Sequence, residues 1–170
     1  MNTVEAKNML QAASFGPSPQ LWLDLGCGSG VFTSALAELL PSGSQVIGID
    51  KSFQHLPKSS ANGVRISFVQ ADFSHAFKME RFDGVMMANS LHYMSEQENM
   101  IDRLALLMGS LPQFLIVEYD SDAANPWVPY PIKYAQLEYL SSNKGWRITK
   151  LGERQSIYGA KKMYAAQIQS

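Results

Sequence analysis

Three aspartates each stand at the end of a short apolar run, and a glycine-rich loop follows the first of them. Asp24 opens the segment DLGCGSG, Asp50 ends QVIGID, and Asp72 lies in VQADF. Glycines let a loop turn tightly and let its backbone approach a ligand closely. In nucleotide-binding sheets an acid after the second strand usually meets ribose hydroxyls, and a carboxylate after the third can accept from an exocyclic amino group. The pattern predicts a nucleoside site, with a glycine turn that binds nothing as the alternative.

The elements that must position these residues follow from hydrophobic patterning. Predicted strands are Leu21–Leu25, Gln45–Asp50, Val64–Gln70, Phe82–Ala88 and Gln113–Tyr119. Apolar residues on successive positions imply burial on both faces, which is typical of a mostly parallel sheet covered by helices. Helices are predicted at Val4–Ala13, Val31–Leu40, Ser95–Gly109 and Ile132–Ser142, with a short helical stretch interrupted by Pro57 after the second strand. Ser95 is the expected N-cap of its helix, with Glu98 as capping-box partner.

The C-terminal tail has a different organisation. Two runs, GWRITKLGERQSIYG and KKMYAAQIQS, are joined at Gly159 and Ala160. Parallel neighbours need a crossover of about a dozen residues or more, so these runs are expected to pair antiparallel. The predicted fold class is therefore α/β, a doubly wound and mostly parallel seven-stranded sheet flanked by helices and ending in an antiparallel hairpin.

Composition limits the classes of function. The chain has 170 residues, 46% of them hydrophobic, which suits one globular domain. A net charge of -1 provides no excess positive charge to attract nucleic acid or anionic membranes, so neither is an expected partner. The single cysteine, Cys27, rules out an intramolecular disulfide framework, and no metal site is predicted. Without a signal-like segment or a spanning apolar run, the expected location is cytoplasmic.

Four segments resemble the motifs of a known family in order and spacing. LDLGCGSG, GID ending at Asp50, QADF and FDGVMMANSLHY are similar to the first four motifs of the class I S-adenosylmethionine-dependent methyltransferases, especially their small bacterial members with small-molecule acceptors. The resemblance covers Leu21–Tyr119. It implies a Rossmann-like methyltransferase domain over residues 1–170, comprising an N-terminal helix (1–20), a cofactor-binding core (21–119) and an acceptor-side insertion, helix and terminal hairpin (120–170).

The resemblance also implies S-adenosylmethionine as cofactor. Its contacts are expected at Asp24, Gly26, Cys27, Gly28, Gly30, Asp50, Lys51, Asp72, Phe73, Asn89 and Ser90. Asp24 and the glycines would hold the methionine part, Asp50 the ribose, and Asp72 with Phe73 the adenine, while Asn89 would lie beside the methionine. Lys51 stands where an apolar residue is more usual, although its aliphatic stem can still pack on the ring.

The acceptor side depends on residues after the fourth and fifth strands. His92 is the candidate base, because an imidazole titrates near neutrality; local packing within the motif is the alternative. The other expected pocket residues are Tyr93, Glu118, Tyr119, Trp127 and Tyr130. The segment NPWVPYP is predicted to form a wall or lid, or else a rigid connection. Only about twenty residues precede the first motif, so the pocket is open, closed by a homodimer partner or covered by this segment.

The predicted reaction is in-line transfer of a methyl group to an O, N, S or C nucleophile of a small molecule. Two alternatives compete with it. An NAD(P)-dependent oxidoreductase uses the same kind of sheet, but its GxGxxG fingerprint requires a third glycine where this chain has Val31. A module that binds the cofactor without chemistry is the second alternative, since methyl transfer needs no protein nucleophile whose absence would be visible.

Overall fold

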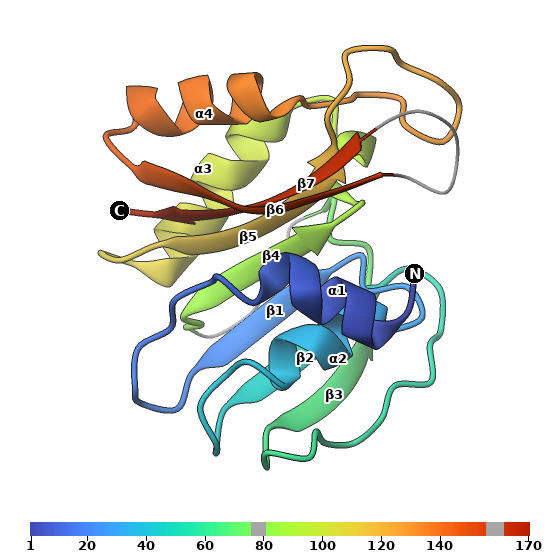
Figure 1. The fold of residues 1–170 in the computed structure, drawn as a ribbon, viewed down its shortest axis with the longest axis vertical. Helices are drawn as coiled ribbons and strands as arrows, with labels where there is room; N and C mark the ends of the chain where they lie inside the picture. The colour runs from blue at the N-terminus through green and yellow to red at the C-terminus, as the bar shows by residue number, and fades with distance from the viewer. Residues whose placement is uncertain (76–80, 156–161) are drawn as a thin grey trace.

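One twisted sheet runs through the whole molecule (Figure 1). The computed structural model describes residues 1–75, 81–155 and 162–170. The sheet has seven strands in the order β3-β2-β1-β4-β5-β7-β6. They are β1 (Leu21–Leu25), β2 (Gln45–Asp50), β3 (Arg65–Gln70), β4 (Gly84–Ala88), β5 (Gln113–Tyr119), β6 (Arg147–Gln155) and β7 (Lys162–Gln169). The pairs among β1 to β5 are parallel, whereas β7 is antiparallel to both β5 and β6. The predicted fold class is confirmed, although the expected joint at residues 159–160 lies outside the described residues.

Helices cover both faces of the sheet (Figure 1). They are α1 (Thr3–Leu10), α2 (Val31–Ala37), the short 3-10 helix η1 (Leu91–Tyr93), α3 (Gln97–Met108) and α4 (Tyr134–Asn143). Along β1, Trp22 belongs to the core formed with α1 and α2, while Leu23 and Leu25 belong to the core formed with α3 and α4. Because side chains alternate along a strand, Asp24 faces the α2 side. No helix in the described part of the chain has the length and apolar character needed to cross a bilayer.

The segment after β2 does not form the expected helix. Residues 51–64 contain no helix, so the prediction of a helical stretch around Pro57 is wrong. Proline removes a backbone donor that a helix would use. The segment instead lies over the glycine loop, where Leu56 is so close that a Cβ atom on Gly30 would come within 2.4 Å of its Cδ2 atom. Packing against the glycine loop has overridden a weak local tendency to form a helix.

The start of α3 also differs from the prediction. The helix begins at Gln97, its N-cap is Glu96, and no side chain caps it by a hydrogen bond, so the capping box between Ser95 and Glu98 is wrong. The Glu98 carboxylate lies 3.0 Å from Nζ of Lys144, which follows α4. Because Glu96 is the N-cap, Ser95 lies one residue outside it and Glu98 is not at N3, so the two residues do not have the positions that a capping box needs.

Candidate functional site

The glycine loop after β1 is shaped by three backbone conformations that favour glycine. Gly26, Gly28 and Gly30 have φ angles of 78°, 49° and 80°. A Cβ atom on Gly26 would lie 2.5 Å from Cβ of Ser90, which leaves no room for a side chain. In the described part of the chain, a Cβ atom on Gly28 would meet nothing within 4 Å. The loop is therefore packed tightly at Gly26 and Gly30 and open at Gly28.

Two aspartates hold this loop from different sides. Asp50 accepts hydrogen bonds from the N–H groups of Gly28, at 3.0 Å, and Ser52, at 2.9 Å. Asp24 is completely buried, and its Oδ2 atom accepts a hydrogen bond of 2.6 Å from the Thr33 hydroxyl. Burial raises the pKa of Asp24 to about 7; the Thr33 hydrogen bond opposes this rise and the charge of Asp50 adds to it. Among the described residues, Oδ1 of Asp24 has no hydrogen-bond partner.

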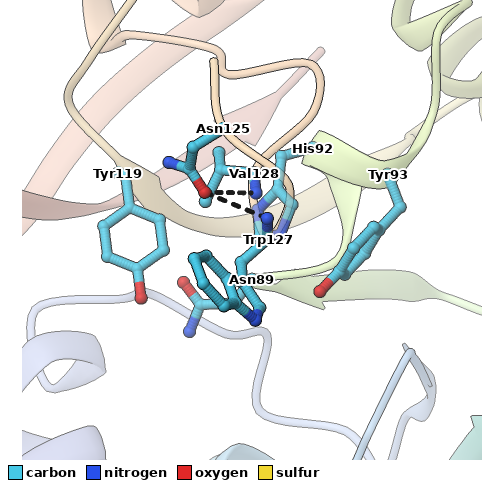
Figure 2. A pocket seen from close by; sticks show the side chains of 7 residues that line it. All are labelled: Asn89, His92, Tyr93, Tyr119, Asn125, Trp127 and Val128. Atoms are coloured by element: carbon cyan, nitrogen blue, oxygen red, sulfur yellow. Dashed lines mark hydrogen bonds between the residues drawn. The ribbon is translucent and has the colours of Figure 1, made fainter. Parts of the chain in front are cut away.

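Two cavities adjoin at this edge of the sheet. A cavity of about 280 Å³ lies beside the loop and is lined by Met1, Gly26, Cys27, Gly28, Ser29, Val31, Phe32, Ala88, Asn89, Tyr119, Arg154, Gln155 and Met163. A cavity of about 690 Å³ is lined by Asn89, His92, Tyr93, Tyr119, Asn125, Trp127 and Val128 (Figure 2). Asn89 and Tyr119 line both, so they mark the junction between the two spaces.

Asn89 has an unusual conformation at this junction. Its φ of 56° is positive, which is uncommon for a residue other than glycine, and strained conformations of this kind concentrate at functional sites. The Asn89 N–H donates to the carbonyl of Val117 over 2.8 Å, which fixes the backbone at the end of β4. Its side-chain Oδ1 is buried and has no partner in the described part of the chain. Unpaired buried polar atoms are rare, and a bound ligand or water is a common explanation.

His92 and Glu118 form a buried pair behind the larger cavity. Nδ1 of His92 lies 2.6 Å from Oε2 of Glu118, and the His92 backbone N–H donates to Oε1 over 3.1 Å. Their exposed fractions are 2% and 0%. The Tyr130 N–H donates to the His92 carbonyl over 3.0 Å, and Gln97 donates to the Tyr130 carbonyl over 2.7 Å. These bonds fix η1 to the end of β5 and to the loop that follows it.

Aromatic rings surround the opening of this cavity. The His92 ring centroid lies 4.4 Å from that of Tyr93 and 6.2 Å from that of Tyr119. In the loop after β5, Oδ1 of Asn125 accepts from the N–H groups of Trp127, at 3.0 Å, and Val128, at 3.1 Å. This turn buries Val128 and leaves Trp127 76% exposed at the rim. Figure 2 shows the aromatic side chains and Asn89 grouped around one space.

The structure brings most of the predicted acceptor residues together. Tyr93, Tyr119 and Trp127 line the larger cavity beside His92. Glu118 and the Tyr130 side chain are not among its described lining residues. Glu118 contacts His92 from behind, and Tyr130 contributes backbone hydrogen bonds. Asn125 and Val128 also line the cavity; they belong to the segment NPWVPYP, the predicted wall, but sequence reasoning did not single out these two side chains, although an Asn-Pro pair favours a turn.

The predicted adenine contacts are less closely assembled. Phe73 is buried against Gly26, where a Cβ atom would lie 3.3 Å from its ring. Asp72 is exposed and accepts from both the N–H and the hydroxyl of Ser74, and these bonds hold its pKa below the ordinary value. Lys51 is exposed and lines neither cavity among the described residues.

Two predicted loop contacts have clear packing roles. Cys27 is buried, and burial raises the pKa of its thiol to about 12, with the charges of Asp24 and Asp50 adding to the rise. The side chain is therefore a protonated thiol that fills space in the loop. The Ser90 hydroxyl donates to the carbonyl of Leu25 and packs beneath Gly26.

This sheet, with a glycine loop after β1 and an acid after β2, defines a Rossmann-like nucleoside-binding architecture. Residues 23–108 match the family described as the methyltransferase domain. The match covers about half of the chain, and the chain belongs to this methyltransferase family. The predicted resemblance is thereby confirmed, and family membership favours it over the oxidoreductase alternative.

Similar proteins agree with this membership. Trans-aconitate 2-methyltransferase of Acidovorax sp. (strain JS42) is 33% identical over 133 residues, which are 77% of this chain and 48% of that protein. The chain thus spans about half the length of the curated relatives it matches. A solved structure, 1,6-didemethyltoxoflavin-N1-methyltransferase from Burkholderia thailandensis with S-adenosylhomocysteine bound, has a TM-score of 0.67 at 20% identity, covering 99% of this chain and 78% of that one.

A second solved structure supports the fold. A cyclopropane-fatty-acyl-phospholipid synthase-like protein from Lactobacillus casei has a TM-score of 0.67 at 14% identity, covering 99% of this chain and 90% of that one. At these identities the structural likenesses establish the shared fold alone.

Proposed function

We propose that the chain is an S-adenosylmethionine-dependent methyltransferase that acts on a small molecule. The observation that carries this proposal is the pair of adjoining cavities, one beside the glycine loop and one beside His92, with Asn89 and Tyr119 at their junction. Two reactants bound on either side of such a junction are held in one relative orientation. Holding reactants in a near-attack geometry can supply a large part of the rate enhancement.

The residues around the smaller cavity fit this cofactor. The open edge at Gly28 lets backbone amides approach its methionine part, and the unpartnered Oδ1 of Asp24 is a suitable acceptor for its amino group. Asp50 uses one lone pair of each oxygen on Gly28 and Ser52. A carboxylate offers about four acceptor positions, so lone pairs remain for the ribose hydroxyls.

The adenine end is proposed at the loop after β3. The buried position of Phe73 against the glycine loop supports its role as a packing surface for the purine. Asp72 is exposed and has acceptor positions beyond those that Ser74 uses, which suits an exocyclic amino group. The aliphatic stem of Lys51 is the proposed cover for the other face of the ring.

When bound, the cofactor supplies an electrophilic methyl group on a sulfonium. The chain's own residues bind and orient the acceptor and take up its proton. Asn89 and Tyr119 border the passage between the cavities, and His92 lines the acceptor side. His92 is therefore proposed as the base for acceptors that must lose a proton.

The proposal is tested in two steps with the purified chain. Calorimetric titration with S-adenosylhomocysteine should show saturable binding at one site, whereas NADH should give no heat. Labelled S-adenosylmethionine is then offered with a panel of small molecules that includes trans-aconitate, because the curated relatives carry that name. Heat with NADH alone, or none with S-adenosylhomocysteine, contradicts the proposal. Binding without transfer to any compound favours the non-catalytic module.

A further inference from the structure

We propose that Glu118 positions His92 as the general base for a ring-bound hydroxyl group. The acceptor class would then be a flat small molecule with a phenolic or enolic hydroxyl. This inference rests on the proposed methyl transfer and deepens it. Glu118 was expected in the pocket wall, but its carboxylate lies against the His92 imidazole instead.

Both oxygens of Glu118 contact the same residue. Oε1 accepts the His92 backbone N–H, and Oε2 meets Nδ1 of the ring. In the proposed arrangement Glu118 is ionised; an ionised carboxylate only accepts hydrogen bonds, so Nδ1 carries the proton. In a neutral imidazole the other ring nitrogen, Nε2, then keeps its lone pair. Among the described residues no hydrogen bond engages Nε2, and the ring lines the larger cavity.

A purely structural role explains this pair poorly. Burying two ionisable groups carries a desolvation cost that a well-packed apolar pair of similar volume would avoid. The backbone of η1 is already tied to the following loop through the Tyr130 N–H and the His92 carbonyl. What the carboxylate adds is a fixed ring orientation and a fixed tautomer. Both are what a base directed at one acceptor atom requires.

The walls of the cavity define the shape of the acceptor. Tyr93, Tyr119 and Trp127 present aromatic rings around a space of about 690 Å³, which is within the usual size of small-molecule pockets. Such surfaces favour a planar molecule by stacking and edge contacts. Among the described lining residues none is Lys or Arg, and Glu118 places a carboxylate behind His92, so the surroundings are unfavourable for a carboxylate acceptor.

The chemistry of the base selects the acceptor atom. A hydroxyl must lose its proton as it gains a methyl group, whereas a neutral amine attacks with its own lone pair and a carboxylate is already ionised at neutral pH. In the proposed step the O–H proton moves to Nε2 of His92. The oxygen forms a bond to the methyl carbon, and the electron pair of the broken S–C bond stays on sulfur, giving a neutral thioether. The imidazolium that forms is stabilised by Glu118.

The acceptor class is tested with matched compounds. Hydroxy, amino and carboxy derivatives of benzene, naphthalene and quinoline are incubated with the chain and labelled S-adenosylmethionine. At least one hydroxy compound should be methylated, at least about tenfold faster than its amino and carboxy counterparts. Transfer confined to amino or carboxy members, or absent from every hydroxy member, overturns this inference. S-adenosylhomocysteine binding in the same samples shows separately whether the proposed function stands.

The role of Glu118 is tested with Glu118→Gln. Both partners of the carboxylate are donors, but glutamine has one acceptor oxygen. If that oxygen stays on the fixed backbone N–H, the amide NH₂ faces Nδ1 and drives the ring proton to Nε2, which removes the base. We expect kcat on the hydroxy acceptor to fall by about 100-fold or more, as in His92→Gln, with little change in S-adenosylhomocysteine affinity. The matched controls, Glu138→Gln and His55→Gln, change exposed residues and should keep the wild-type rate.

Two further readouts separate positioning from folding. Nitrogen NMR of the His92 ring should show a protonated Nδ1 in the wild type and a protonated Nε2 in Glu118→Gln. The acidic limb of the pH–rate profile should be present in the wild type and absent from both variants. The titratable groups around His92 are Glu118 and Tyr119 of β5 and Tyr93 of η1, with Tyr164 of β7 near Glu118. An unchanged tautomer together with a wild-type profile in Glu118→Gln would overturn the positioning role.

Discussion

The cofactor side and the acceptor side of this site are built by different means. The cofactor side depends on backbone shape, since the glycine loop has three positive φ angles and meets Asp50 through a main-chain N–H. The acceptor side depends on side chains from the ends of β4 and β5, from η1 and from the turn at Asn125. A site made of backbone tolerates few substitutions, whereas one made of side chains can change its ligand without changing the fold.

The strongest contrast is expected within the glycine loop. Gly26→Ala forces a Cβ atom to 2.5 Å from Ser90 at a φ of 78°, so it should lower the free energy of unfolding by about 2–4 kcal/mol and abolish cofactor binding. Gly28→Ala meets open space, so it should cost only about 1 kcal/mol of stability while weakening S-adenosylhomocysteine binding more than about tenfold. Urea unfolding and calorimetry measure both effects. Equal stability of the two variants would refute the packing difference.

Asp24 should make stability depend on pH. Its pKa is raised to about 7 in the folded chain, so the folded state binds a proton that the unfolded state has released. The resulting stabilisation is full below about pH 4 and is lost as the pH rises through about 7, by roughly 2–3 kcal/mol between pH 5 and pH 8. Urea unfolding at both pH values measures this slope, which should largely disappear in Asp24→Asn. A wild-type slope in the variant would mean that another group titrates.

Asp50 should affect cofactor binding more than folding. Asp50→Ala removes the proposed ribose contact and the acceptor for the Gly28 N–H, so S-adenosylhomocysteine affinity should fall by about 10- to 100-fold in calorimetry. Asp122→Ala, which removes an exposed carboxylate paired with Lys133, is the matched control and should bind normally. Unchanged affinity in Asp50→Ala would place the ribose elsewhere.

Trp127 should show the mildest and most selective effect. The residue is 76% exposed, so Trp127→Ala should leave the free energy of unfolding within about 0.5 kcal/mol of wild type. Loss of a rim surface should raise the KM for a flat acceptor by about three- to tenfold while leaving cofactor affinity unchanged. Tyr139→Ala, at an exposed position of α4, is the control for aromatic loss. A fall in cofactor affinity in Trp127→Ala, alongside the higher KM, would contradict the separation between the cofactor side and the acceptor side.

Local signals predicted the strands of the sheet well. The strands Leu21–Leu25, Gln45–Asp50 and Gln113–Tyr119 have the predicted bounds, because apolar runs bounded by turn residues determine them. The acceptor side needed information that no local pattern contains. Glu118 is 26 residues from His92, and only the pairing of β4 with β5 brings them together. The failed capping box has another cause, because helix α3 begins one residue later than the local motif predicted. The proposed division at residues 20 and 119 stays a prediction.

A crystal structure of the chain with S-adenosylhomocysteine would test the two-cavity arrangement most directly. The methionine part should lie along the glycine loop with its amino group near Oδ1 of Asp24. The sulfur should lie between Asn89 and Tyr119, facing the cavity that His92 lines. A ligand that fills the larger cavity, or a sulfur directed away from that junction, would contradict the arrangement.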